Sequence, residues 1–158
     1  MRSLITLAVF VAGIGQAQAL SCLAPSVQTS FTAASDAEES YVMAVGRLTP
    51  LPGETPPEQP ADPNDRKGYT LQTQFDGNLA TLDGFTDASR FFVTVEVVCA
   101  GPWCGAVPSD EMLFFIERRG DQNVLVEGPC PQYALPATEQ VVDGAMSCVT
   151  GRGCTPPE

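Results

Sequence analysis

The stretch YTLQTQFDG, residues 69–77, alternates apolar and polar side chains and ends in an Asp-Gly pair. Every second residue from Tyr69 to Phe75 would lie on one face of an extended strand, because successive side chains of a strand point to opposite faces. Asp-Gly is a common turn signal. We therefore expect a half-buried strand that ends at Asp76-Gly77.

Four more segments are rich in apolar and β-branched residues and also predict strands. They are residues 41–48, 91–99, 112–118 and 124–127. Gly120-Asp121 separates the last two, which is typical of a hairpin. Five strands of this length favour a small barrel or sandwich.

Two segments predict short helices. Pro25 and Ser26 precede apolar residues at helical spacing, and the acidic group 36–39 follows them. Residues 138–146 place apolar side chains on one side of a second helix. The expected fold is thus mainly β, a small, mostly antiparallel barrel or sandwich of five strands with two short helices.

The N-terminus predicts export. Three features of this segment are typical of a signal peptide: a positively charged start, an apolar run over residues 4–14, and the small-x-small pattern Ala17-Gln18-Ala19. Residues 1–19 would then be the leader, and residues 20–158 a single domain with an exposed, Pro-rich acidic loop at 49–67. We expect a periplasmic or secreted protein that is not inserted in a membrane. Lipidation at Cys22 is the alternative, but Ala19 occupies the position where a branched aliphatic residue is expected.

Charge and composition exclude several functions. The formal net charge is −11, or about −12 once Arg2 leaves with the leader, which opposes nucleic-acid binding. The chain contains no histidine, so it lacks Ser-His-Asp and Cys-His catalytic groups and imidazole metal ligands. We expect no catalytic residues, no cofactor and no metal, and therefore not an enzyme.

An even number of cysteines in an exported chain predicts a disulfide framework, here with 15 alternative pairings. The six are Cys22, Cys99, Cys104, Cys130, Cys148 and Cys154. If the two short local loops close, Cys22 would be left with Cys130. Zinc binding is disfavoured because no Cys-x-x-Cys pair is present. A thiol-disulfide function of Cys99 with Cys104 stays the enzymatic alternative, although four residues intervene instead of two.

Other side chains have a functional and a structural interpretation. Trp103, in a Gly-Pro turn between two cysteines, is a candidate partner-binding anchor, yet we favour a cap on one end of the barrel. The acids of residues 62–65 predict a solvated loop more than a calcium site. Three other carboxylates and the Arg118-Arg119 pair should face solvent; the carboxylates are Asp110, Glu111 and Glu117.

Residues 22–31, CLAPSVQTSF, resemble the start of the tissue inhibitors of metalloproteinases, whose netrin-like domains place Cys, Pro, Gln and an aromatic residue at these spacings. Weaker similarity continues in residues 41–47, 111–114 and 125–130. The resemblance implies an OB-fold-like five-stranded barrel, and it favours a Cys22 to Cys130 disulfide.

The resemblance also implies inhibition of a metalloprotease through the N-terminus, but two departures weigh against it. Leu20 stands where those inhibitors have a zinc-chelating cysteine, and Thr32 replaces a second early cysteine. We expect an exported netrin-like binding module, either protease-inhibitor-like or partner-binding, with a purely structural envelope protein as the alternative. Candidate contacts are Leu20, Ser21, Cys22 and Trp103, and the partner would be a protein or a glycan.

Overall fold

The computed structural model describes residues 21–155, so the expected leader and Leu20 lie outside the described residues. Two helices, α1 (Val27–Asp36) and α2 (Glu139–Val149), and one 3-10 turn (Pro63–Asp65) accompany eight strands. The strands are β1 (Ser40–Pro50), β2 (Tyr69–Thr81), β3 (Gly84–Val97), β4 (Cys99–Ala100), β5 (Trp103–Cys104), β6 (Met112–Arg119), β7 (Gln122–Glu127) and β8 (Ala134–Pro136).

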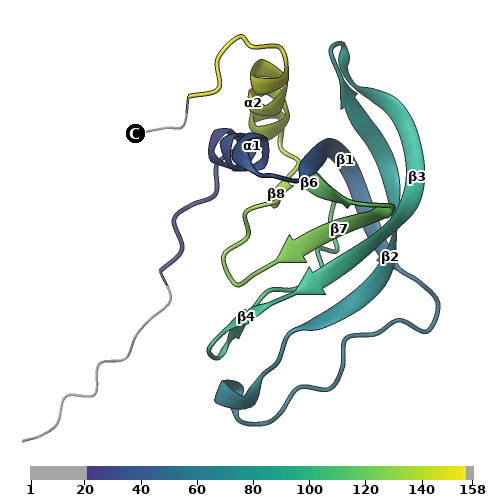
Figure 1. The fold of residues 1–158 in the computed structure, drawn as a ribbon, viewed down its shortest axis with the longest axis vertical. Helices are drawn as coiled ribbons and strands as arrows, with labels where there is room; N and C mark the ends of the chain where they lie inside the picture. The colour runs from purple at the N-terminus through teal and green to yellow at the C-terminus, as the bar shows by residue number, and fades with distance from the viewer. Residues whose placement is uncertain (1–20, 156–158) are drawn as a thin grey trace, which may run out of the picture.

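Five strands close into a barrel in the order β1-β2-β3-β7-β6, because β1 also pairs with β6. Four of these pairings are antiparallel and the β3–β7 pairing is parallel. β8 extends β6, and β4 with β5 forms a separate small hairpin. The predicted mainly β barrel with two short helices is confirmed. Figure 1 shows both helices together on one side of it.

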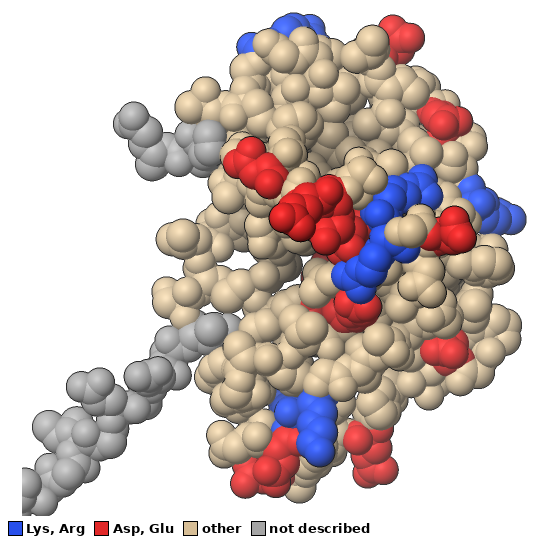
Figure 2. All heavy atoms as spheres, viewed as in Figure 1, with Lys and Arg blue, Asp and Glu red and all other residues tan. Residues whose placement is uncertain are grey.

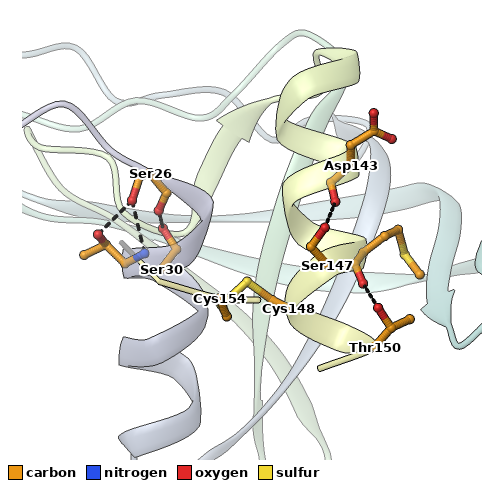
Figure 3. Close-up of a disulfide and its surroundings, with 9 residues drawn as sticks. Ser26, Ser30, Asp143, Ser147, Cys148, Thr150 and Cys154 are labelled. Atoms are coloured by element: carbon orange, nitrogen blue, oxygen red, sulfur yellow. Dashed lines mark hydrogen bonds between the residues drawn. A yellow bond between two sulfur atoms is a disulfide. The ribbon is translucent and has the colours of Figure 1, made fainter. Parts of the chain in front are cut away.

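Each helix begins at a hydroxyl cap. The backbone N–H of Thr29 donates to Ser26 Oγ at 3.1 Å, and that of Val141 donates to Thr138 Oγ1 at 3.3 Å. Such caps satisfy backbone donors that have no partner within the helix. Figure 3 shows Ser26 at the start of α1 beside α2, which carries Cys148.

β6 separates two hydrophobic clusters. Its residues Phe114 and Ile116 point into the barrel, where they pack with Phe75 and other buried side chains. Its residues Leu113 and Phe115 point outward and pack beneath the two helices. Strand alternation explains this division, since neighbouring residues face opposite sides. β6 is therefore buried on both faces.

The turn predicted at Asp76-Gly77 is wrong. β2 continues through these residues to Thr81, and the chain turns at Leu82-Asp83. Gly77 instead lies opposite Gly46 of β1. A Cβ built on Gly77 would lie 2.6 Å from Gly46 Cα and 2.7 Å from the Phe75 ring, so glycine is needed here for close strand approach. Asp76 forms an exposed ion pair with Arg90, which faces it from β3.

Two other predicted boundaries also differ. β1 extends through Pro50, so the exposed loop begins at Leu51, and its 3-10 turn is capped by Asp62. β3 begins at Gly84 rather than Phe91, because the β2–β3 hairpin is longer than the alternating stretches indicate. These differences lengthen the strands without changing their order.

The structure pairs the cysteines as the local loops suggest: Cys22 with Cys130, Cys99 with Cys104, and Cys148 with Cys154. Figure 3 shows the last of these at the end of α2. Three disulfides are typical of oxidising compartments. None of the helices within residues 21–155 is long and apolar enough to cross a membrane.

We expect the Cys22–Cys130 bond to stabilise the fold most, because it closes the longest loop. Its sequence separation is 108, against 6 for Cys148–Cys154. From the loop-closure entropy of the unfolded chain, the long loop should stabilise the folded state by about 5 kcal/mol and the short loop by about 2 kcal/mol. Denaturant unfolding of C22A/C130A and C148A/C154A would measure the two losses; equal losses would contradict the prediction.

A second expectation concerns the glycine contact between β1 and β2. Gly77→Ala should lower the free energy of unfolding by about 1–3 kcal/mol, because the added methyl group overlaps backbone rather than a flexible side chain. Gly128→Ala is the matched control, since a Cβ there meets its nearest atom at 3.5 Å. Thermal unfolding of both variants provides the comparison, and an unchanged midpoint for Gly77→Ala would refute the steric argument.

Candidate functional site

The N-terminal segment is fixed to the barrel at one point. Cys22 is bonded to Cys130, which follows β7, with the two Cα atoms 5.4 Å apart. Ser30, in the first turns of α1, donates from Oγ to the carbonyl oxygen of Gln132 at 2.5 Å. Between these anchors Leu23 is 93% exposed. The segment thus holds an apolar side chain in solvent at a defined position.

A disulfide-closed hairpin lies at the same end of the barrel. Cys99 faces Cys104 across β4 and β5, Ala100 faces Trp103, and Gly101 turns the chain with a φ of +59°. Glycine adopts such a left-handed conformation without the steric cost that a Cβ brings. The bond closes a loop of only six residues, which limits the hairpin to few conformations.

Backbone contacts join this hairpin to the end of β7. The N–H of Val98 donates to the carbonyl oxygen of Glu127 at 2.9 Å. The N–H of Gly105 donates to the carbonyl oxygen of Val98 at 3.0 Å. A Cβ on Gly105 would lie 2.6 Å from the carbonyl carbon of Glu127, so the backbones are in close contact. Trp103 is therefore carried on a rigid support.

Trp103 is 46% exposed and is not among the residues of the two hydrophobic clusters. Val98, 43% exposed, lies between the hairpin and the β7–β8 connection, with its methyl group 3.5 Å from a Cβ built on Gly128. In Figure 1 the N-terminal segment leads down from α1 past the β7–β8 connection, and the β4–β5 hairpin lies below that connection. We call the exposed residues Leu23, Val98 and Trp103 the apolar end.

A buried carboxyl lies beneath this end. Glu127 is only 3% exposed, and its Oε1 has no hydrogen-bond partner among the described residues. Burial raises the pKa of Glu127 to about 7. Sequence reasoning missed Glu127 because an acid at a strand end ordinarily faces solvent. The only signal was its position two residues after Leu125, on the same face of β7.

Several other charged side chains form ion pairs. Glu117, expected to face solvent, is 6% exposed and accepts hydrogen bonds from Arg119 Nε at 2.7 Å and Nη2 at 3.0 Å. Arg119 also pairs with Glu96, so the pair Arg118-Arg119 does more than end a strand. Arg118 lies over the ring of Phe91, 5.4 Å from its centroid. Figure 2 shows acidic and basic side chains interspersed on this face.

The other predicted positions carry little chemistry. Asp110 and Glu111 are exposed, and Glu111 lies 3.7 Å from Arg47. Asp62 Oδ1 accepts from the backbone N–H of Asn64 at 2.9 Å, which occupies it as a turn cap. Across residues 21–155 no group of three or more potential ligands could hold a metal ion. Every cysteine in that range is in a disulfide.

No protein-family model, curated protein sequence or solved structure matches this chain. The resemblance to netrin-like inhibitors therefore stays a prediction from residues 22–31.

Glu127 predicts a pH dependence of stability. The folded protein keeps this carboxyl protonated up to about pH 7, whereas the unfolded chain releases the proton near pH 4.5. Stability should therefore fall as the pH rises from about 4.5 to 7 and then level off, by about 3 kcal/mol in all.

The variant Glu127→Gln stays neutral and should lose this slope, so that it gains stability relative to the natural protein above pH 7. Glu58 is exposed, so Glu58→Gln is the control and should keep the same dependence of stability on pH as the natural protein. Urea unfolding at pH 5 and pH 8 measures the difference. Parallel pH profiles for the natural protein and Glu127→Gln would contradict a buried, unpartnered carboxyl.

Proposed function

We propose that this protein is an exported binding module of netrin-like type, and that it contacts a protein partner through the apolar end and the adjoining N-terminal residues. Export is supported by the leader pattern in residues 1–19 and by three disulfides. The observation that carries the proposal is Trp103, exposed on a hairpin that a disulfide and backbone contacts hold rigid.

Rigid exposed aromatic residues favour protein interfaces. A tryptophan buries a large area on binding and loses little conformational entropy when its support is already ordered. Leu23 and Val98 add apolar surface around it. Three exposed large apolar residues at one end of a highly acidic chain are typical of an interaction surface rather than of a solvated one.

The N-terminal resemblance suggests which partner to test first. With the leader removed after Ala19, the chain would begin at Leu20, two residues before the anchored Cys22. A free α-amine at that distance from an anchor is suited to coordinate the zinc of a metalloprotease. The missing chelating cysteine leaves Leu20 without a disulfide of its own, so its ordering entropy would lower the affinity.

Trp103→Ser should weaken partner binding about 30-fold, the effect of losing about 2 kcal/mol at an interface hot spot. Mature protein immobilised by its C-terminus would be used to capture proteins from the extracellular and periplasmic fractions of its own source. Leu82→Ser is the matched control, because Leu82 is 76% exposed at the tip of the β2–β3 hairpin, at the other end of the barrel.

A specific partner should be retained by the natural protein and by Leu82→Ser but lost with Trp103→Ser. Equal retention by all three would overturn the proposed surface. A purified zinc metalloprotease tests the narrower role: mature protein should slow peptide cleavage, and one extra residue before Leu20 should abolish the effect. Inhibition that survives the extra residue would exclude the N-terminal mechanism.

A further inference from the structure

A second site lies at the end of the barrel opposite Trp103. It is a cavity of about 550 Å³ between α1, the start of β1 and the β2–β3 hairpin. Phe31, Tyr41, Met43, Phe115 and Val149 are among the side chains that line it. These apolar groups come from both helices and from two strands. The site therefore depends on the assembled fold.

Two strand edges meet this cavity without pairing to each other. β1 pairs with β6 from Ser40 onward, but it pairs with β2 only from Ala44. β2 pairs with β3 as far as Thr81, but with β1 only as far as Leu79. Residues 40–43 and Ala80 line the cavity, so the two strands separate at this place.

Because β1 and β2 separate at the cavity, backbone N–H and C=O groups at this edge of β1 are available to a ligand. In an antiparallel strand, alternate residues direct their N–H and C=O groups to opposite edges. The N–H of Leu51 donates to Gln72 of β2, so the odd-numbered residues of β1 face β2, and Tyr41 lies beyond the first β1–β2 pair, Ala44 with Leu79. Tyr41 therefore offers one N–H and one C=O group to an extended segment at this edge. Such free edges are where proteins add a peptide as an extra strand.

The charge around the cavity selects the ligand. Glu39 and Asp87 line it, both are exposed, and no lysine or arginine is among the lining residues. Arg118 is the cation opposite Ser40 on β6, but its guanidinium is engaged with Asn123 and the Phe91 ring. A ligand with a positive side chain is therefore complementary to the rim.

We propose that this groove binds an extended peptide that pairs with the free edge of β1, placing an apolar side chain among Phe31, Met43 and Phe115 and a basic side chain beside Glu39 or Asp87. The free strand edge at Tyr41, an apolar floor and an acidic rim each constrain the ligand, and a peptide of alternating basic and apolar residues meets all three constraints. This site is separate from the apolar end and does not depend on the role of Trp103.

The probe is a fluorescein-labelled hexapeptide of three Lys-Val repeats, with three Glu-Val repeats as its control. Fluorescence anisotropy at low salt should show saturable binding of the Lys peptide and none of the Glu peptide. The backbone amide of Tyr41, which faces away from β6, should exchange hydrogen more slowly in the complex. Trp103→Ser should bind the probe normally, which distinguishes this site from the proposed interface.

Two changes isolate the groove. Glu39→Gln with Asp87→Asn should weaken binding about threefold to thirtyfold, the effect of losing two exposed charge pairs. Glu58→Gln with Asp65→Asn removes the same charge from the loop at the other end and should leave binding unchanged. All four substitutions are at exposed positions, and thermal unfolding would verify that both double variants fold.

A third change tests strand pairing itself. The Lys-Val peptide N-methylated at alternate residues keeps its charge and side chains but loses strand donors, so its binding should fall at least tenfold. Equal binding of the methylated peptide would overturn strand addition. Three other results would overturn the site. They are equal binding by the two double variants, no saturable binding of the Lys peptide, and protection from exchange only at amides outside residues 40–43.

Discussion

The structure depends on one strand that is buried on both faces. β6 places Phe114 and Ile116 inside the barrel and Leu113 and Phe115 beneath the helices. It also pairs with β1, β7 and β8, so it closes the barrel and supports the layer outside it. The helices are 10 and 11 residues long, too short to be stable alone, and they are stabilised by packing on this strand.

Much of this arrangement could be predicted from local patterns. The helical spacing of apolar residues after Ser26 and the apolar runs of β1, β6 and β7 are local signals, and the structure confirms the elements that they predict. The Asp76-Gly77 prediction failed because the same dipeptide suits a turn and a close contact between strands. Only the presence of Gly46 on the neighbouring strand distinguishes the two, and a single stretch of sequence carries no information on its neighbour. The parallel pairing of β3 with β7 was not predicted for the same reason.

The candidate sites were predicted less completely. The disulfides follow from spacing, and Trp103 was recognised as a candidate, but its exposure depends on how the hairpin joins β7. The burial of Glu117 and Glu127 was missed because acids near strand ends usually reach water. The groove had no local signal, since it exists because β1 joins β6 four residues before it joins β2. Sites formed by the divergence of strands are properties of topology rather than of any motif.

Barrel closure also constrains the order in which this chain acquires structure. Val42 of β1 pairs with Ile116 of β6, and Cys22 bonds with Cys130, so the earliest described segments have partners in the last third of the chain. No N-terminal portion can complete a core while the rest is still being made. Contacts so distant in sequence slow folding, because a long loop must close before they form. The whole chain should thus become ordered in one late, cooperative step, after residue 130 is free to join.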